Sequence, residues 1–287
     1  MKKIGLVIRD ARKEIKGLVD TLISWSSSHN CEIILEKESA KLLNLDNSLE
    51  IKELCNSTEL IITLGGDGTL IGISRDAIKS DTAILGVKFG NLGFLTETTP
   101  DELLETLEDY LNDKVNYAER SMLSLSLLRN NKEYLSSYAV NDLVIQKSSQ
   151  SGLISLDLKA NDEDVCRLRA DGVIFSTPTG STAYSLAAGG SIAHPDLSII
   201  LITPICPHSL TNRPLIMPSD TTLKVKVPDH QGDMLISVDG QISEKLKPGD
   251  DIIITLSGKK LKFIESKKRS YFEILRTKLN WGLGYES

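Results

Sequence analysis

Several signatures by which common enzyme classes are recognised are missing from this sequence of 287 residues. It contains neither a G-x-S-x-G segment nor an H-E-x-x-H segment, which removes the usual support for a serine hydrolase or a metal hydrolase. The four cysteines are far apart and form no C-x-x-C pair, so neither a zinc site nor a disulfide framework is indicated. Cysteines used in this way fit a protein of the reducing cytoplasm.

Long apolar segments and an excess of positive charge are also missing. No segment approaches a membrane span, and the apolar run Ile4–Ile8 is stopped by Arg9 and Asp10, too early for a secretory signal. A formal net charge of -6 argues against a dedicated nucleic-acid binder. The basic stretch from Lys259 to Arg269 flanks alternating apolar residues, which favours a solvated strand face. We therefore expect a cytoplasmic protein that binds neither nucleic acid nor a membrane.

What the sequence does contain is an alternation of strand and helix patterns in its first part. Short apolar runs at Ile4–Ile8, Glu32–Leu35, Leu60–Leu64 and Ala83–Val87 predict buried strands of a parallel sheet. After the first run comes an amphipathic helix pattern, with an apolar face of Ile15, Leu18, Val19, Leu22 and Ile23. The segment from Thr99 to Glu102 has the form of a capping box and predicts another helix start. This alternation indicates an α/β domain with a parallel sheet covered by helices.

After about residue 120 the period of the apolar residues changes to two. Leu123, Leu125 and Leu127 alternate with serines, and the polar residues 130–132 predict a turn into a second strand. Further short strands are expected at Ile154–Leu158, Val165–Leu168, Val173–Phe175, Leu223–Val227, Leu235–Val238, Ile252–Leu256 and Leu261–Ile264. The pattern predicts a β-rich, sandwich-like domain at 121–269 after the α/β domain at 1–120. Residues 270–287 are expected to form a C-terminal helix that returns to the first domain.

The segment Gly65-Gly66-Asp67-Gly68 lies between the strand Leu60–Leu64 and a helix expected from Thr69. Glycines carry no Cβ, so a ligand can approach their backbone closely, and a helix N-terminus favours anions. The pattern is not a P-loop, which would end in lysine followed by Ser or Thr, nor is it G-x-G-x-x-G. It predicts a phosphate-binding turn with Asp67 beside the phosphate. The alternative is that the aspartate only caps the helix.

A second unusual segment, DGVIFSTPTGSTAYSLAAGG at 171–190, leads from a strand through a hydroxyl-rich loop into an Ala-rich helix. The hydroxyls of Thr179 and Thr182 can both donate and accept hydrogen bonds, and Tyr184 offers a flat face for a base. Gly180 permits close approach of a ligand. The loop therefore predicts recognition of a polar ligand, with the alternative that Ser181 or Thr182 only caps the following helix.

Several segments together resemble the bacterial NAD kinases. They are GGDGTL at 65–70, NLGFLTE at 91–97, ND at 141–142, the segment 171–190, PICPHSLTNRPL at 204–215, DGQ at 239–241 and KLNWG at 278–282. GGDG alone is shared with lipid kinases and phosphofructokinases, but its combination with GSTAY is highly specific. The resemblance covers most of the chain. It implies a phosphotransferase that moves the γ-phosphoryl group of ATP, with a divalent metal expected to be Mg²⁺, to the 2′-hydroxyl of the adenosine ribose of NAD, giving NADP.

The resemblance also implies residue roles. Asp67 is the expected catalytic proton acceptor, and no residue is assigned as a metal ligand. The expected substrate-binding residues are Gly66, Gly68, Phe94, Asn141, Asp142, Arg169, Asp171, Thr179, Thr182, Ala183, Tyr184, Ser185, Leu186, Ala187 and Gln241. Asn141 with Asp142 matches the pair that holds ribose hydroxyls. Many relatives carry Asn-Glu at this pair, so the carboxylate of Asp142 is one methylene shorter than theirs.

The resemblance further implies self-association as a dimer or tetramer, in which Asp171 and the Tyr184 loop meet substrate across a subunit boundary. The many short strands after residue 120 agree, because their sheet edges need covering. Two other functions remain open. A GGDG-type lipid or sugar kinase is one, and a lipid kinase would present an apolar acceptor pocket or a membrane-facing surface. A non-catalytic NAD(P) sensor is the other, and it has no need for a carboxylate beside phosphates that repel it.

Overall fold

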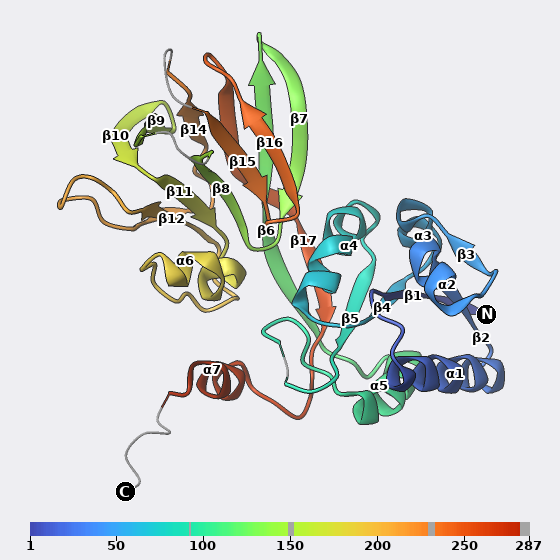
Figure 1. Ribbon diagram of the computed structural model, residues 1–287. Helices are drawn as coiled ribbons and strands as arrows, with labels where there is room; N and C mark the ends of the chain where they lie inside the picture. The colour runs from blue at the N-terminus through green and yellow to red at the C-terminus, as the bar shows by residue number, and fades with distance from the viewer. Residues whose placement is uncertain (92, 149–151, 229–232, 282–287) are drawn as a thin grey trace, which may run out of the picture. The chain divides into compact units, whose positions relative to one another are not determined.

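The structure, a computed structural model, describes residues 1–91, 93–148, 152–228 and 233–281 (Figure 1). Leu92 and Gly282 of the motifs above therefore lie outside the described residues. The chain divides into unit 1, residues 1–119 with 261–287, and unit 2, residues 120–260. The sequence places the second junction at 269/270, whereas unit 2 ends at Lys260, inside a strand.

The elements of unit 1 alternate between strand and helix. They are β1 (Lys2–Ile8), α1 (Lys13–Ser28), β2 (Cys31–Glu36), α2 (Lys37–Leu43), β3 (Ser48–Leu49), α3 (Ile51–Ser57), β4 (Leu60–Leu64), α4 (Asp67–Ser80), β5 (Ala83–Val87), a 3₁₀ helix (Pro100–Glu102), α5 (Leu103–Leu111) and α7 (Tyr271–Leu279). The strands pair in the order β3-β2-β1-β4-β5, all parallel. The predicted α/β domain is confirmed.

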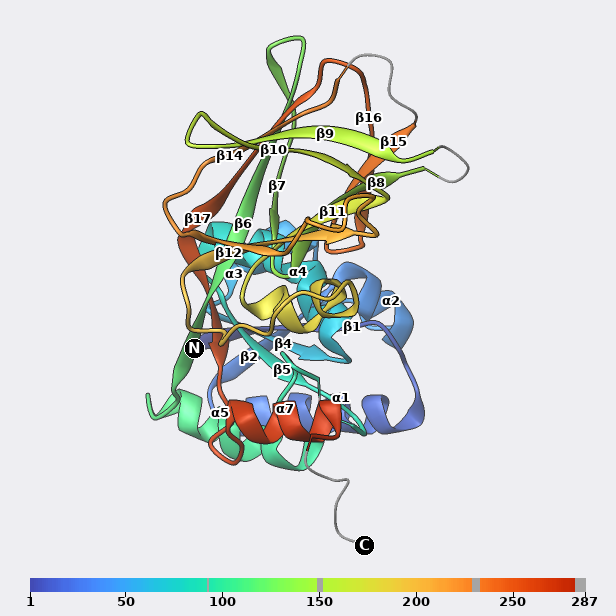
Figure 2. The same cartoon turned by 90° about the vertical axis from the view of Figure 1, so that its left-hand side faces the viewer.

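Helices cover both faces of this parallel sheet. Figures 1 and 2 show α1 and α5 on one face and α3 and α4 on the other. Ile15, Val19 and Leu22 of α1 pack with Leu103 and Leu107 of α5 in one buried cluster under the sheet. Because both faces are covered, every residue of β4 and β5 is buried, which explains why these strands read as continuous apolar runs.

The strands of unit 2 are antiparallel and form two layers. Its elements are β7 (Lys132–Ala139), β8 (Asp142–Lys147), β9 (Ile154–Ala160), β10 (Glu163–Ala170), β11 (Gly172–Ser176), a 3₁₀ helix (Thr179–Thr182), α6 (Tyr184–Ala187), β12 (Ile199–Ile205), β13 (Leu215–Pro218), β14 (Leu223–Lys226), β15 (Met234–Val238) and β16 (Ile242–Leu246). The chain passes between the units within β6 (Tyr117–Arg129) and β17 (Asp251–Ile264). One layer has the order β13-β12-β11-β8-β15-β16, and the other contains β10-β9-β14-β17 with β6 and β7.

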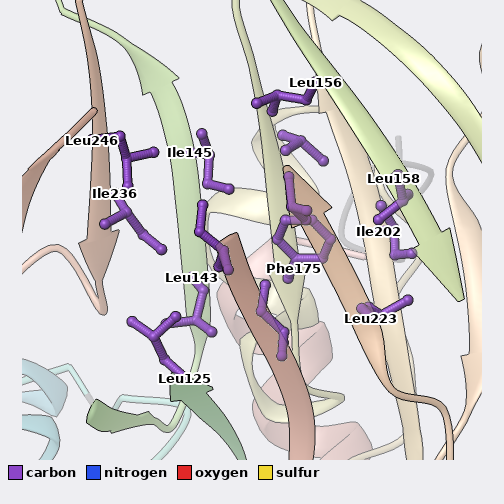
Figure 3. Close-up of a cluster of buried hydrophobic side chains, with 14 of the residues drawn as sticks. Leu125, Leu143, Ile145, Leu156, Leu158, Phe175, Ile202, Leu223, Ile236 and Leu246 are labelled. Atoms are coloured by element: carbon purple, nitrogen blue, oxygen red, sulfur yellow. The ribbon is translucent and has the colours of Figure 1, made fainter. Parts of the chain in front are cut away.

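The inner faces of these two layers enclose the core of unit 2. Figure 3 shows the fully buried ring of Phe175 from β11 among side chains that include Leu156 of β9 and Leu223 of β14. Ile145 of β8 and Ile236 of β15 belong to the same cluster. The predicted sandwich-like domain is therefore confirmed.

Two local expectations are wrong. The two strands expected at Ile252–Leu256 and Leu261–Ile264 are one strand, β17, because extended backbone continues through the polar residues between them. Ile23 is 37% exposed, and Trp25 takes its place on the buried face of α1. The helix expected after the hydroxyl loop is present as α6, but it has only four residues, since Ala183 leaves helical geometry before it and Gly189 takes a positive φ of 87° after it.

Other elements are absent from the expectations altogether. They are α2, α3, β3, β12, β13 and β16. Within the described residues, none of the helices combines the length and the apolar character needed to cross a membrane.

The basic stretch before α7 is paired with acids of unit 1. Lys267 bonds Asp109 (2.6 Å) and Lys268 bonds Glu105 (2.8 Å). Arg269 donates two hydrogen bonds to Glu102, from Nη1 to Oε2 and from Nη2 to Oε1, each 2.9 Å long. This hydrogen bonding lowers the pKa of Glu102 to about 2. Glu102 also completes the predicted capping box of Thr99. The charges of this stretch therefore stabilise unit 1.

Candidate active site

The glycine turn of unit 1 connects β4 to α4. Gly65 donates its N–H to the carbonyl of Val87 on β5 (2.9 Å), and Gly66 is the N-cap of α4, with no side-chain cap. Asp67 and Gly68 are the first two residues of α4, so this helix begins two residues before the expected Thr69. Asp67 is not the cap residue, and its carboxylate is engaged elsewhere.

Both oxygens of the Asp67 carboxylate accept hydrogen bonds from residues 94–96. Oδ2 accepts from the backbone N–H of Phe94 (2.9 Å). Oδ1 accepts from the N–H of Leu95 (3.3 Å) and from both the N–H (3.1 Å) and the hydroxyl of Thr96 (2.8 Å). Each carboxylate oxygen has about two acceptor positions, so Oδ1, with three donors, is fully used, whereas Oδ2, with one donor, keeps a position open. Asp67 can therefore accept a proton from a substrate at Oδ2 while residues 94–96 hold Oδ1.

Gly93 makes this arrangement possible. A Cβ at Gly93 would lie 1.8 Å from Oδ1 of Asp67 and 2.5 Å from the hydroxyl oxygen of Thr96. Residues 93–96 can therefore surround the carboxylate only because residue 93 has no side chain.

A pocket of about 190 Å³ lies beside the same turn. Gly65 and Gly66 line it together with the cationic side chains of Arg9, Arg12 and Lys88. Arg9 is bonded to Glu36 and Arg12 to Asp10, each at 2.6 Å. Lys88 forms no ion pair with the described residues, and its ammonium lies 3.7 Å from the position of a Cβ on Gly66. Lys88 is therefore free to meet an anion at the turn.

In unit 2, residues 140–142 form the turn that leads into β8. The N–H of Thr177 donates to the carbonyl of Asn141 (2.9 Å), and the hydroxyl of Thr177 donates to that of Val140 (2.5 Å). A Cβ on Gly180 would lie 2.1 Å from the carbonyl oxygen of Asn141. The hydroxyl-rich loop thus packs directly on the Asn141-Asp142 pair that was expected to hold ribose.

A pocket of about 370 Å³ brings four of the expected residues together. They are Asn141, Asp142, Ala183 and Tyr184. Tyr184 is 43% exposed, whereas Asp142 is only 6% exposed. Burial, and secondarily the charge of Asp239, raise the pKa of Asp142 to about 7. Its carboxylate therefore changes charge near neutral pH.

Other expected residues lie around this loop without lining the pocket. The hydroxyl of Thr179 is buried without a hydrogen-bond partner in the described residues, and Thr182 donates to the carbonyl of Thr179 (3.3 Å). Ser185 is buried, and its hydroxyl bonds that of Thr203 on β12 (2.9 Å), so it faces the protein interior. Leu186 is half-buried and Ala187 is exposed on α6.

Arg169, Asp171 and Gln241 are separate from the pocket lining. Asp171 bonds Lys147 at the far end of β8 (2.6 Å), about 17 Å of strand from Asp142. Arg169 is an exposed residue of β10, and Gln241 is exposed in the turn between β15 and β16. The structure thus gathers one group of expected residues around Asp142 and leaves Asp171 at the other end of the same strand.

Sequence reasoning missed two residues that contact the expected site. Lys88 was not assigned because a single lysine after an apolar run carries no signal of its own. Asp239 bonds residues 140–142 although it lies about a hundred residues further along the chain, and only its place in the DGQ segment pointed to it.

The described residues contain no group of three or more His, Cys, Asp or Glu side chains that could hold a metal ion. Mg²⁺ usually binds through one or two carboxylates together with substrate phosphates, and so does not require such a group.

Comparisons with known proteins cover nearly the whole chain. A family model described as ATP-NAD kinase N-terminal domain matches residues 4–115, and one described as ATP-NAD kinase C-terminal domain matches residues 140–266. The NAD kinase of Magnetococcus marinus is 38% identical over 285 residues, with 98% of this chain and 94% of that protein covered. The NAD kinase of Geobacter sulfurreducens is 38% identical over 282 residues, with coverage of 98% and 99%.

Solved structures agree in fold. A yeast NADH kinase complexed with NADH matches with a TM-score of 0.88 and 26% identity, covering 100% of this chain and 89% of that one. An NAD kinase from Archaeoglobus fulgidus in complex with ATP matches with a TM-score of 0.75 and 23% identity, covering 97% and 98%.

Proposed function

This chain belongs to the ATP-NAD kinase family, and on that premise we propose that it transfers the γ-phosphoryl group of ATP to the 2′-hydroxyl of the adenosine ribose of NAD, producing NADP. The observation that carries the proposal is that relatives named NAD kinase are 36–39% identical over 98% of the chain. A lipid or sugar kinase and a non-catalytic sensor are not favoured, because none of the matched proteins named above is of either kind.

Unit 1 supplies the proposed phosphate-binding group, which is the glycine turn. Amides at the start of α4 and the ammonium of Lys88 would hold the ATP phosphates, because both favour anions. Asp67 would act as proton acceptor through Oδ2, which accepts one hydrogen bond, while Oδ1 is held by residues 95 and 96. A divalent metal, which we expect to be Mg²⁺, would neutralise phosphate charge, and the carboxylate of Asp67 is a suitable ligand type for it.

Unit 2 contains the proposed sugar-binding pocket. Asn141 and Asp142 would bond the ribose hydroxyls, and the exposed ring of Tyr184 would stack on a base. Together with Gly66, Gly68, Phe94 and the loop 179–187, these residues form the proposed substrate contacts. Gln241 would add a contact from the adjoining β15–β16 turn.

The protein is further proposed to act as a homo-oligomer, dimer or tetramer, in which Asp171 and the Tyr184 loop meet substrate across a subunit boundary. The distance of Asp171 from Asp142 along β8 supports a role of Asp171 in a second site. The edge strand β13 also exposes Leu215 and Ile216, at 37% and 57%, and so offers apolar surface that a second chain could cover. Mixing Asp67→Asn chains with Asp171→Ala chains should then restore activity that neither has alone. A fully active monomer at assay concentration would contradict this assembly.

We place the protein in the cytoplasm, because all four cysteines are free thiols, as expected in a reducing compartment. The direct test of function is incubation with ATP, Mg²⁺ and NAD, with NADP detected by an NADP-specific dehydrogenase. Formation of NADP that depends on both ATP and the protein is expected. Absence of NADP, with ATP consumed on a sugar or lipid acceptor, would overturn the proposal.

A further inference from the structure

The carboxylate of Asp239 in unit 2 accepts hydrogen bonds from three consecutive backbone N–H groups. Its Oδ2 accepts from Val140 (3.0 Å), and its Oδ1 accepts from Asn141 (2.7 Å) and Asp142 (3.1 Å). The backbone N–H of Asp239 in turn donates to the carbonyl of Asp142 (2.9 Å). A side chain that bonds three successive amides restrains the direction of that backbone, because a change in the conformation of 140–142 would break these hydrogen bonds.

The remaining backbone groups of this turn are also occupied. The carbonyls of Val140 and Asn141 accept from Thr177, and Ser176 adds a hydroxyl bond to Asn141 (3.2 Å). All six backbone polar groups of residues 140–142 are thus held by two loops from opposite sides. The side chains of Asn141 and Asp142 are the groups of this pair left to line the pocket.

The conformation of Asp239 itself is unusual. It has a positive φ of 50°, a left-handed conformation that non-glycine residues adopt rarely, and Gly240 follows with a φ of 64°. The strands on either side are closely joined, since Val238 pairs with Ile242. The turn between β15 and β16 thus places an acidic residue in a left-handed position while directing its carboxylate at a neighbouring strand.

From these contacts we propose that Asp239 is a positioning residue for the sugar acceptor: it holds the 140–142 backbone so that Asn141 and Asp142 face the ribose hydroxyls of the dinucleotide. This inference rests on the proposed function, because it assigns Asp239 to the proposed sugar-binding pocket of unit 2. Asp239 has no role in the chemistry and acts through its neighbours.

Asp239 also controls the charge of the group it positions. Asp239 and the phenol of Tyr184 are the ionisable neighbours of Asp142 in the pocket, and no lysine, arginine or histidine is among its described lining residues. A second carboxylate nearby raises the pKa of Asp142 in addition to the effect of burial. An ionised carboxylate is the stronger acceptor for a sugar hydroxyl. NAD affinity should therefore increase as pH rises through about 7.

The test is titration calorimetry of NAD binding to the full chain between pH 5.5 and 8.5 without ATP. Asp239→Asn removes the charge and two of the acceptor positions, so NAD binding at pH 8 should weaken about tenfold, and the pH midpoint should fall by about one unit. Asp233→Asn is the matched control, because Asp233 precedes the same strand, β15, but pairs with exposed Lys245 (3.3 Å). It should leave both affinity and midpoint unchanged.

The outcomes separate this inference from the proposed function. If the unaltered protein does not bind NAD at all, the proposed function fails. If it binds NAD and Asp239→Asn matches it in affinity and midpoint, the positioning role is wrong. If Asp239→Asn does not fold, amide hydrogen exchange of the unaltered protein still tests the inference. The N–H groups of residues 140–142 should exchange as slowly as those of β8, and exchange as fast as an exposed loop would overturn the inference.

Discussion

Two aspartates of the candidate site, one in each unit, are held in opposite ways. Asp67 is surrounded by four donors from residues 94–96, and both of its oxygens are used. Asp142 is buried, no hydrogen bond contributes to its altered pKa, and its charged neighbour is another carboxylate. Both aspartates come just before or at the start of a regular element, so local sequence does not distinguish them.

The difference shows that the surroundings, and not the residue type, decide how a carboxylate can act. A carboxylate held by four donors serves to fix a loop, and only the remaining acceptor position on Oδ2 is available to a substrate. A buried carboxylate without donors is stabilised when a ligand donates hydrogen bonds to it, because an unsatisfied buried acceptor costs about 1 to 3 kcal/mol. The predictions below test this contrast, from the largest expected effect to the smallest.

Replacing Asp67 should have the largest effect. Asp67→Asn puts an amide NH₂ where an oxygen now accepts, so one donor of the 94–96 segment meets another donor. It also removes the proposed proton acceptor, and turnover should fall about 10²- to 10⁴-fold, or roughly 3 to 5.5 kcal/mol of barrier. Steady-state assay of NADP formation measures this. Near-normal turnover would end the assignment of Asp67 as the proton acceptor.

Replacing Asp142 should change stability with pH. A raised pKa in the folded state means that Asp142 adds stability fully below its unfolded pKa of about 3.9, and this stability is lost as pH rises through about 7. Asp142→Asn does not titrate. Its advantage in unfolding free energy over the unaltered protein should therefore grow between pH 4 and 7 and then level off, at about 2 to 4 kcal/mol.

Urea denaturation at several pH values checks this expectation. If the difference in unfolding free energy between Asp142→Asn and the unaltered protein stays constant from pH 4 to 8, ionisation of Asp142 in the folded state has no free-energy cost. The contrast between the two aspartates would then lose one of its sides.

Gly180→Ala should weaken NAD binding about 10- to 100-fold, or roughly 1.4 to 2.8 kcal/mol. The new Cβ would overlap the carbonyl of Asn141 and push the 140–142 turn away. Gly258→Ala in β17 is the matched control, because no atom lies within 4 Å of its Cβ position. Calorimetric affinities that are equal for the two variants would show that the position of Asn141 does not matter for NAD.

The smallest effect is expected for Thr96→Val. It removes one of the four donors to Asp67 and leaves the carboxylate in place, so unfolding free energy should fall by about 0.5 to 1.5 kcal/mol with turnover changed less than about threefold. A loss of turnover as large as that of Asp67→Asn would mean that Asp67 acts mainly by fixing the loop.

Much of the fold is visible in the sequence where apolar periodicity is long or uninterrupted. The strands β4 and β5 have the bounds that the pattern predicts, and the helix α7 lies within the segment expected to be helical. The helices α2 and α3 were missed because seven residues span only two helical turns, too few to establish a period. β12 was missed because it contains Pro204, a residue that argues against a strand.

The site was less predictable than the fold for a different reason. The GGDG and hydroxyl-loop segments are recognisable by their composition, and the resemblance to the NAD kinases assigned roles to their residues. The groups that hold Asp67 and the 140–142 turn lie 27 to 29 and 97 to 99 residues away along the chain, and a single sequence carries no sign of such pairings. Ser185 illustrates the converse, since its segment suggested a ligand contact and its hydroxyl is used inside the protein.

Because unit 1 is built from both ends of the chain, synthesis on the ribosome completes the two units in the reverse of their order in sequence. All of unit 2 has been made once Lys260 is added. Unit 1 then still lacks Ile264, which belongs to its buried cluster, and Arg269, the partner of Glu102. Unit 1 can therefore be completed only after Ile264 and Arg269 have been added. A premature stop after Lys260 would leave all residues of unit 2 in place and would remove part of unit 1, although most of unit 1 is translated first.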